Sequence, residues 1–452
     1  MLRRLRLDGF VSTASFRRLR LGGGAAQATS VFRMQEIVVT GVGCLTPCGN
    51  SLDALWDALM AGRSGIREVT TFDTSDYAVH IAGEVRDFEP RDYGIDSKEA
   101  RRLDRFVLLA LAASREALEQ ADLPSAAVPA ERVGCLVGTG IGGITSTEHQ
   151  MGVLQTRGPS RVSPLLVPSG TPDAAATQIS LQVGFKGPAY SVCTACSSGS
   201  DSIVSAVRCL LDGSADVMVT GGAEAPISQL ALSTFANLGA LSTADGDPTR
   251  VCRPFDRDRS GFVLGEGAGI LVIETRDHAE RRGVEILGVL AGYGQTSDAF
   301  HKTAPDPEGA GAARAMSLAL ERARISAEEI GYVNAHGTST LQNDPVETSA
   351  IKMALGKHAS RVPVSSTKSM TGHLIGAGGA VEAIIVLEAI RRGCIPPTIN
   401  YENPDPQCDL DYVPNEPRDA DLRVVLSNSL GFGGHNASLV FCAADYQRSP
   451  PR

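Results

Sequence analysis

Short runs of apolar residues recur along the chain, and most of them end at or near a glycine or another small residue. The runs lie at 37–42, 133–137, 217–219, 270–273, 424–426 and 439–441. Several are apolar at consecutive positions, which predicts strands that are buried on both faces.

Between many of these runs the apolar residues repeat with helical spacing. This spacing predicts helices at 106–118, 203–211, 310–323 and 381–390, and in the second of these Ile203, Val207 and Leu210 share one face. Strands and helices in alternation predict an α/β fold with mainly parallel strands. Two halves, 34–286 and 287–446, are expected, because each places its reactive-looking residues at a Gly/Ser-rich turn between a strand and a helix.

Composition narrows the class of protein. The 452 residues are 43% hydrophobic and 21% charged, as in an ordinary globular protein, and the net charge of −9 does not suggest a nucleic-acid partner. No apolar run approaches the roughly 20 residues that cross a bilayer, so membrane insertion is not expected. The ten cysteines have no regular spacing, which favours reduced thiols over disulfides.

The first 33 residues form a separate N-terminal extension. They contain seven arginines and one acidic residue, Asp8, a composition typical of a mitochondrial or plastid transit peptide. A disordered extension, or sequence upstream of a true start at Met34, is the simpler interpretation. A cytoplasmic location is therefore expected, with a mitochondrial or plastid location as the alternative. Residues 447–452 are expected to form a short tail.

The segment 191–200 places Cys196 at or near a predicted helix start. N–H groups and the helix dipole at such an N-terminus stabilise a thiolate, the form of cysteine that attacks carbonyl carbons. Cys193 and Cys196 also form a C-x-x-C pair, as in a redox site or half of a zinc site, but the chain has no second C-x-x-C. Two buried, inert cysteines are an equally good interpretation of this segment alone.

Two histidines lie in similar places. His336 ends a predicted strand and precedes Gly337 and three hydroxyl residues, which can bind a polar chain such as a pantetheine arm. A neutral imidazole there can donate a hydrogen bond to a developing oxyanion, although a histidine after a strand is more often structural. His373 lies among Lys368, glycines and alanines, whose small side chains permit packing that holds a ring rigidly. A small-residue helix with a solvated Lys368 is the alternative.

The segment 427–436 places three glycines around Phe432. Such a loop offers free backbone N–H groups and a bulky gate. It lacks the ending of a P-loop and the G-x-G-x-x-G spacing, so we reject a nucleotide site, and an ordinary turn is the simpler interpretation of the loop alone. Together with Cys196, His336 and His373, the loop supplies what Claisen chemistry on thioesters requires: a nucleophile, donors for an enolate and an oxyanion hole.

Taken together, these segments resemble the elongating β-ketoacyl-[acyl-carrier-protein] synthases of type II fatty acid synthesis. The resemblance runs from about Gln35 to Cys442. Its blocks, in order, are VTGVG at 39–43, TAC at 194–196, GGAE at 221–224, RPFD at 253–256, GFVLGEG at 261–267, HGT at 336–338, 368–373 and 427–436. It implies a thiolase-like fold, two similar halves in a duplicated five-layer α/β/α/β/α body with mixed, mainly parallel sheets. Such proteins are usually homodimers.

The resemblance assigns roles to the reactive residues. It implies that Cys196 is the acylated nucleophile, and that His336 and His373 assist malonyl decarboxylation and stabilise the enolate. It implies that Lys368 orders this site. The backbone N–H groups of Cys196 and Phe432 match the oxyanion hole, with Phe432 as the gate.

Substrate contacts are implied in the same way. Thr338 and Thr340 match residues that hydrogen-bond the pantetheine arm. Ile141 and Phe235 match the acyl pocket, and an isoleucine at position 141 favours the subgroup that makes longer chains.

A carrier protein and a cation are also implied. Basic residues at Arg101, Arg102 and Arg161 match contacts with the acidic acyl carrier protein, although a solvated charged face explains them equally well. Some relatives bind a monovalent cation, K+ or Na+, near positions that match Asn334, Ala335, Glu382, Ser427 and Asn428. No other cofactor is implied, because the carrier protein brings its own phosphopantetheine.

The implied activity is that of a 3-oxoacyl-[acyl-carrier-protein] synthase, which condenses malonyl and acyl carrier proteins with loss of CO2 in fatty acid elongation. A polyketide-type ketosynthase of the same fold is one alternative. A non-catalytic partner subunit is another, but such subunits typically lack the cysteine that Cys196 supplies.

Overall fold

Strands and helices alternate through the chain, as the apolar pattern predicts. The computed structural model describes residues 35–123 and 128–447, so the predicted extension at 1–33 lies outside the described residues. The strands are β1 (Ile37–Leu45), β2 (Arg67–Glu68), β3 (Ile81–Ala82), β4 (Val133–Gly138), β5 (Ala189–Tyr190), β6 (Val217–Glu224), β7 (Gly267–Thr275), β8 (Gly288–Ser297), β9 (Tyr332–Asn334), β10 (Val364–Ser365), β11 (Cys394–Ile395), β12 (Arg418–Asp419), β13 (Val424–Gly431) and β14 (His435–Cys442).

The helices include the four that the spacing predicts, which are α3, α7, α10 and α13. The α-helices are α1 (Leu52–Met60), α2 (Ser97–Ala100), α3 (Arg105–Gln120), α4 (Ile144–Arg157), α5 (Leu166–Gly170), α6 (Ala174–Val183), α7 (Ser198–Leu211), α8 (Gln229–Asn237), α9 (Arg276–Arg282), α10 (Ala310–Ala323), α11 (Asn343–Leu355), α12 (Lys368–Thr371) and α13 (Gly378–Arg392). None of these described helices is long and apolar enough to cross a membrane.

Ten strands form one sheet whose two halves repeat the same topology. The order is β10-β9-β13-β14-β8-β1-β7-β6-β4-β5. Numbered within each half, both sets of five strands read 3-2-4-5-1. The sheet is mixed: β4, β5 and β6 run parallel, as do β9, β10 and β13, whereas the pairings in the centre are antiparallel. The sequence pattern did not indicate this antiparallel centre, because a strand buried on both faces looks the same in either direction.

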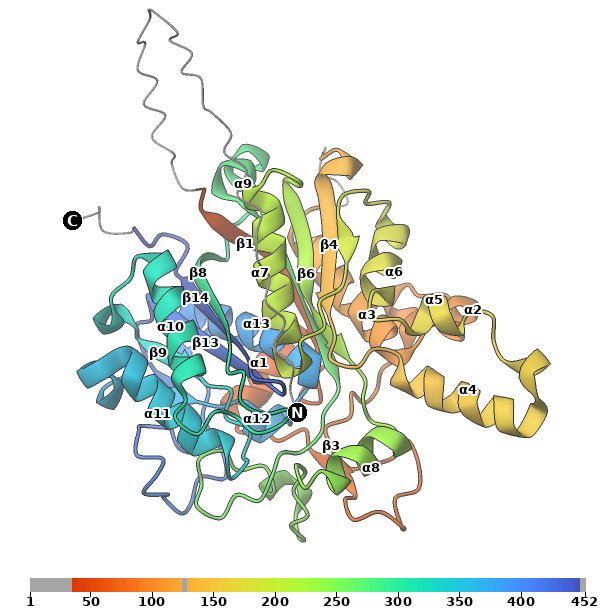
Figure 1. Ribbon diagram of the computed structural model, residues 1–452. Helices are drawn as coiled ribbons and strands as arrows, with labels where there is room; N and C mark the ends of the chain where they lie inside the picture. Colours follow the sequence, from red (N-terminus) through yellow and green to blue (C-terminus); the bar gives the residue numbers. More distant parts are fainter. Residues whose placement is uncertain (1–34, 124–127, 448–452) are drawn as a thin grey trace, which may run out of the picture. The chain divides into compact units, whose positions relative to one another are not determined.

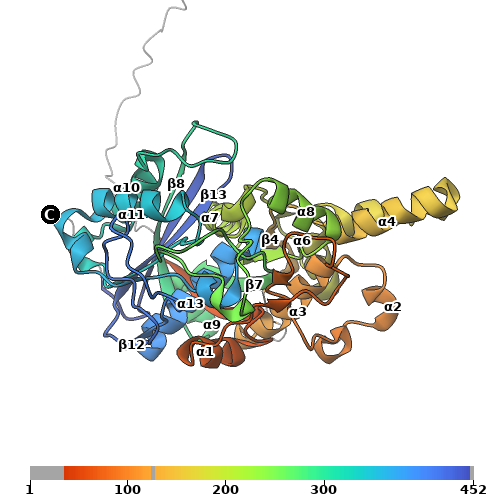
Figure 2. The same cartoon turned by 90° about the horizontal axis from the view of Figure 1, so that it is seen from below.

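Helices cover both faces of each half of the sheet, which gives the five-layer α/β/α/β/α body. Helices α3 and α6 pack on the outer face of the first half, and α10 and α11 on the outer face of the second. Helices α7 and α13 lie between the halves and share one apolar core with both. Figure 1 shows α7 and α13 between β4 and β6 on one side and β8, β13 and β14 on the other, and Figure 2 shows α4 projecting from the rest of the fold.

The alternation of side chains along each strand accounts for this layering. In β7, Ile270 and Val272 belong to the core beneath α3, whereas Leu271 and Ile273 belong to the core around α7 and α13. Alternate side chains of one strand therefore enter different cores. Consecutive apolar residues are required because both faces are covered.

The two central helices begin in the same way and approach closely. Each follows a 3-10 turn whose first residue has a positive φ, Ala195 (+51°) before α7 and Ile375 (+46°) before α13. A Cβ at Gly199 of α7 would lie 2.8 Å from the Gly376 carbonyl oxygen and 2.9 Å from the Ala380 nitrogen. Small residues thus bring the starts of the two helices together, and with them the segments of Cys196 and His373.

Candidate active site

Cys196 lies in the 3-10 turn Ala195–Ser197 that leads into α7, as its sequence context predicts. Its side chain is buried, with 6% of its surface exposed. Ala195 before it has a left-handed backbone conformation, which residues with a Cβ seldom adopt. The sulfur is therefore presented by a strained turn at the N-terminus of a central helix.

Burial opposes the stabilisation of a Cys196 thiolate by the helix N-terminus. Burial raises the pKa of the Cys196 thiol to about 11, although the backbone N–H groups of Phe432 and of Cys196, and the charge of Lys368, lower it. Removal of the sulfur from water disfavours its charged form more strongly than the helix terminus favours it. At neutral pH the side chain is a thiol that loses its proton only when it reacts.

All ten cysteines are free, in agreement with the predicted reduced thiols. Cys193 is exposed, and its sulfur donates to the Gly140 carbonyl oxygen at 3.4 Å. The C-x-x-C pair is therefore not joined by a disulfide.

The loop between β13 and β14 closes against the turn of Cys196. The N–H of Phe432 points at the Cys196 sulfur, and Phe432 packs in the same apolar cluster. A Cβ at Gly431 would lie 2.9 Å from the Thr194 carbonyl oxygen and 3.2 Å from the Cys196 nitrogen, so only glycine fits there. Two backbone N–H groups converge on the sulfur, which is the arrangement that an oxyanion hole needs.

His336 lies two residues beyond the end of β9 and is buried. Both oxygens of Glu347, on α11, accept backbone N–H groups of this turn, from His336 at 2.7 Å and from Gly337 at 2.8 Å. Burial lowers the pKa of His336 well below its ordinary value, and Lys368 and His373 act in the same direction. The imidazole is therefore neutral at pH 7.

His373 lies in the turn between α12 and α13 and is also buried. Its N–H donates to the Val263 carbonyl at 2.7 Å, and its own carbonyl accepts the N–H of Gly265 at 2.9 Å. Phe262 packs edge-on against the ring, with centroids 5.2 Å apart. Burial, aided by the charge of Lys368, lowers the pKa of His373 well below its ordinary value. This imidazole is neutral as well, and its backbone is fixed on both sides.

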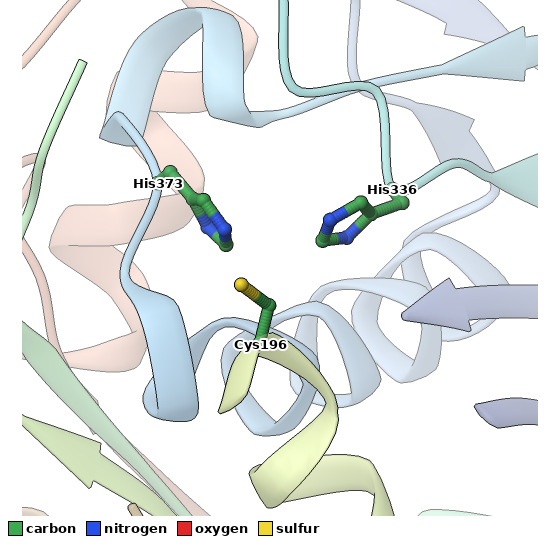
Figure 3. A group of neighbouring side chains, drawn as sticks. All are labelled: Cys196, His336 and His373. Carbon is green, nitrogen blue, oxygen red and sulfur yellow. The ribbon is translucent and has the colours of Figure 1, made fainter. Parts of the chain in front are cut away.

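The structure brings Cys196, His336 and His373 together. Figure 3 shows both imidazoles pointing toward the sulfur. The sulfur and one ring nitrogen of each histidine lie within 4.8 Å of one another, and Nδ1 of each ring has no hydrogen-bond partner among the described residues. A thiol and two neutral imidazoles this close can exchange a proton or donate hydrogen bonds to one substrate oxygen. The same atoms could bind a metal, but no fourth described His, Cys, Asp or Glu side chain joins the group to close a tetrahedral zinc site.

Lys368 is not solvated, which excludes the alternative of an exposed lysine. It is 2% exposed and forms an ion pair with Glu382 of α13. Burial raises the pKa of Glu382 to about 7, although Lys368 lowers it. The pair places a positive charge beside the histidines, where it disfavours their protonation.

The three reactive side chains line one cavity of about 480 Å³. The predicted acyl-pocket, pantetheine and gate residues line the same cavity: Ile141, Phe235, Thr338, Thr340 and Phe432. The Oγ1 atoms of the two threonines are 3.0 Å apart. The cavity thus combines apolar and hydroxyl-bearing walls around the sulfur.

Glu224, at the end of β6, is a site residue whose function could not be inferred from the sequence. Its carboxylate accepts the N–H groups of Gly140 at 2.5 Å, Ile141 at 3.1 Å and Gly376 at 3.0 Å. Burial raises its pKa to about 6. It connects the wall of the acyl cavity to the start of α13. The GGAE block marked the position, but nothing local shows which distant N–H groups the carboxylate accepts.

Four buried side-chain oxygens have no hydrogen-bond partner among the described residues. Three of them belong to the predicted cation set, Asn334 Oδ1, Glu382 Oε2 and Ser427 Oγ, and the fourth is Ser180 Oγ on α6. Asn334 and Ser427 are register partners on parallel strands, and Ala335 follows β9. The Asn428 amide differs, because it already hydrogen-bonds to three other side chains. Buried oxygens without donors fit a cation that takes oxygen ligands.

The three predicted carrier-contact residues are exposed and do not line the cavity: Arg101, Arg102 and Arg161. The first two follow α2, and Arg161 ends the 3-10 turn Pro159–Arg161 after α4. Contact with a carrier protein stays a prediction for all three.

Known proteins match nearly the whole described chain. The family models "Beta-ketoacyl synthase, N-terminal domain" and "Beta-ketoacyl synthase, C-terminal domain" match residues 34–279 and 287–402. A curated relative from Synechocystis sp., 3-oxoacyl-[acyl-carrier-protein] synthase 2, is 48% identical over 407 residues, which are 90% of this chain and 98% of the relative.

Solved structures share the fold. A β-ketoacyl synthase from Burkholderia phymatum aligns with a TM-score of 0.85 and 35% identity, over 91% of this chain and 100% of that one. A chain from a type II PKS acyl-carrier protein in complex with its ketosynthase, bound to the hexaketide, aligns with a TM-score of 0.83 and 33% identity over the same shares, 91% and 100%.

Proposed function

Because the chain belongs to the β-ketoacyl synthase family, we propose that it is a 3-oxoacyl-[acyl-carrier-protein] synthase of the II type, an acyltransferase of fatty acid elongation. It condenses malonyl carrier protein with acyl carrier protein and releases CO2. The observation that carries this proposal is the meeting of Cys196, His336 and His373 on one cavity.

The first step loads the acyl chain on Cys196. The thiol gives its proton to an imidazole nitrogen within 4.8 Å, and the sulfur adds to the thioester carbonyl. The N–H groups of Cys196 and Phe432 hold the oxyanion. Its collapse breaks the bond to the carrier's pantetheine sulfur, which takes up a proton and leaves.

The second step makes the carbon nucleophile. Malonyl on a second carrier protein loses CO2, and the electrons of the broken C–C bond form an enolate. His336 and His373 each donate one N–H to the enolate oxygen. Their low pKa values serve this step, because a neutral imidazole is too weak an acid to protonate the carbanion before it attacks.

The third step forms the product. The enolate carbon attacks the acyl thioester on Cys196, a C–C bond forms, and the bond to sulfur breaks. The sulfur leaves as a thiolate and takes a proton from water, because its own proton left with the pantetheine thiol in the first step. The 3-oxoacyl chain remains on the second carrier protein.

Lys368 acts through its charge and its ion pair with Glu382. Its ammonium group lowers the pKa of both histidines. It therefore keeps the two rings in the neutral form that the second step requires.

A K+ or Na+ ion bound by Asn334, Glu382 and Ser427 is part of the proposal, and the partnerless oxygens support it. The ion would supply positive charge to three buried oxygens. Binding to the folded state alone raises the melting temperature. We expect K+ or Na+ to raise it relative to tetramethylammonium at equal ionic strength, and Ser427→Ala to remove most of this difference. An equal melting temperature in all salts would contradict the site.

The carrier protein is the proposed partner. The pantetheine arm hydrogen-bonds to Thr338 and Thr340, and the acidic carrier contacts Arg101, Arg102 and Arg161. A relative solved with its acyl-carrier protein supports this assignment. Arg102→Glu should raise KM for carrier-bound substrates without changing kcat. An unchanged KM would show that Arg102 does not contact the carrier protein.

A homodimer is the proposed assembly. Large apolar side chains of α5 and α6 are exposed, with Val167 and Leu181 each 70% exposed, and β5 is an edge strand of the sheet. A second copy would cover such surfaces. Light scattering after size exclusion should give twice the mass of one chain. The proposed location is the cytoplasm, or an organelle if residues 1–33 act as a transit peptide.

A polyketide-type ketosynthase is the second candidate, favoured by the likeness to the hexaketide-bound complex. Substrates separate the two. We expect 3-oxo product and CO2 in equal amounts from malonyl carrier protein with saturated acyl carrier proteins of graded length. Condensation only with poly-β-keto chains would favour the second candidate, and no product with any chain would refute both.

A further inference from the structure

A carboxylate buried behind the nucleophile, that of Asp201, lies in the first turn of α7. Its side chain is 6% exposed. One oxygen, Oδ2, accepts the hydroxyl of Thr194 at 2.6 Å and the hydroxyl of Ser197 at 2.9 Å. Thr194 and Ser197 flank Ala195 and Cys196, so a single oxygen connects the two ends of the turn that carries the sulfur.

This turn requires external support because Ala195 has a φ of +51°. A strained backbone conformation persists only where its surroundings hold it. Hydrogen bonds to a charged acceptor are about twice as strong as neutral ones. The bond from the Thr194 hydroxyl to the Asp201 carboxylate therefore supports the turn. The Ser197 hydroxyl lies 2.9 Å from Asp201 Oδ2 and 2.9 Å from the Thr194 carbonyl oxygen, so either bond ties Ser197 to the same turn.

The other oxygen of Asp201 is held by the second half of the chain. Oδ1 accepts the side-chain amide of Gln295 on β8, and the Gln295 carbonyl oxygen accepts from Arg208 of α7. Both ends of the Gln295 amide are used, so its orientation is fixed. The carboxylate of Asp201 is thereby held in place against the turn.

We propose that Asp201 is a positioning residue for acyl transfer to Cys196. This rests on the proposed function. Through Thr194 and Ser197, Asp201 holds the sulfur where the N–H groups of Cys196 and Phe432 can stabilise an oxyanion. Asp201 does not line the cavity, so it touches no substrate.

The two half-reactions distinguish positioning from general structural support. Malonyl decarboxylation relies on His336 and His373, and neither hydrogen-bonds to Asp201. Asp201→Ala should slow acylation of Cys196 by acyl carrier protein about tenfold or more, and change decarboxylation of malonyl carrier protein alone by less than about threefold. Asp201→Asn keeps an acceptor oxygen for the two hydroxyls, but it loses the charge and sets its NH2 group against the Gln295 amide. It should therefore restore acylation only in part, to a rate between those of Asp201→Ala and the unmodified protein.

Matched variants control the comparison. Asp212→Ala changes the same residue type at the exposed C-terminal end of the same helix, where the carboxylate accepts the Ser214 N–H, and should leave both rates unchanged. Thr194→Val removes one hydroxyl without loss of volume and should reproduce part of the acylation defect, even if Asp201→Ala does not fold. Acylation at the normal rate in Asp201→Ala, or an equal loss in both half-reactions, would overturn the positioning role.

Alkylation of Cys196 by iodoacetamide tests the same role without any carrier protein. Fragment mass spectrometry locates the adduct on Cys196 rather than Cys193. In Asp201→Ala the midpoint of the rate against pH should move upward, because the N–H groups no longer face the sulfur. Loss of a nearby negative charge alone would move it downward. The protein could fail to accept any acyl carrier protein while the alkylation midpoint of Asp201→Ala still moves upward. That result would refute the proposed function but support the role of Asp201 in positioning the sulfur. An unmoved or lowered midpoint overturns that role.

Discussion

His336 and His373 face each other nearly at right angles, with ring centroids 5.2 Å apart and an angle of 86° between the ring planes. Both come from the second half of the chain, whereas Cys196 comes from the first. Their pKa values are lowered by burial and by Lys368. The site therefore contains two neutral imidazoles near the ion pair of Lys368 and Glu382.

The two histidines should contribute stability that declines as the pH falls below about 6.5, whereas the raised pKa values of Glu224 and Glu382 act in the opposite direction. The folded pKa of each histidine is below its unfolded value, so the unfolded chain binds more protons as acid is added. The free energy of unfolding then falls by up to about 1.4 kcal/mol per pH unit for each histidine. Urea unfolding between pH 8 and pH 5.5 measures this slope. His336→Gln together with His373→Gln should remove the histidine part of this slope, whereas His149→Gln, which replaces an exposed histidine, should not. An unchanged slope in the double variant would contradict neutral rings.

Cys196→Ala should separate the two half-reactions. Without sulfur no acyl-enzyme forms, and condensation disappears. Decarboxylation of malonyl carrier protein survives at least in part, because the two histidines that hold the enolate remain. Release of CO2 and formation of 3-oxo product are measured together on the same sample. Condensation at the normal rate in this variant would refute the nucleophile.

Lys368→Met should unfold much more easily than the unmodified protein. Removing one partner of a buried ion pair leaves Glu382 without its countercharge and costs about 3–5 kcal/mol. Lys352→Met is the control, because Lys352 pairs with Asp409 on the surface, where loss of a pair costs about 1 kcal/mol or less. Denaturant titrations measure the free energy of unfolding of both variants. An equal decrease in the two would show that the buried ion pair stabilises the fold no more than the surface pair does.

Ile141→Phe should shorten the longest acyl chain that the cavity accepts. Ile141 lines the cavity, and a larger ring there occupies space that the chain would fill. Competition between short and long acyl carrier proteins gives the ratio of kcat/KM, which should fall for the long chain by about tenfold or more. Met353→Phe, on the exposed face of α11, is the matched control. An unchanged ratio would place the acyl chain elsewhere.

The layered fold followed from the apolar pattern because covered strands need apolar residues on both faces. In β7, Ile270 and Val272 pack into the core on one face of the sheet, and Leu271 and Ile273 pack into the core on the other face. Strand direction did not follow from the pattern, since it is set by connections and hydrogen bonds rather than by burial. The antiparallel centre of the sheet is therefore information that the structure adds.

Some features of the site could likewise be predicted from the sequence, and others could not. Cys196 and His336 could be proposed from the sequence because each stands in a short motif at the end of a strand. The raised pKa of Cys196, by contrast, depends on burial by segments far along the chain. The contacts of Glu224 with Gly376 and of Asp201 with Gln295 have no local signal either, because these residues become neighbours only when the two halves meet.

The most direct measurement is the mass of the protein after one turnover. Incubation with an acyl carrier protein should add the mass of one acyl group, and fragmentation should locate it on Cys196. Malonyl carrier protein should then remove this group as CO2 and 3-oxoacyl carrier protein form in equal amounts. An acyl group on another residue, or one on Cys196 that malonyl carrier protein does not remove, would contradict the proposed function.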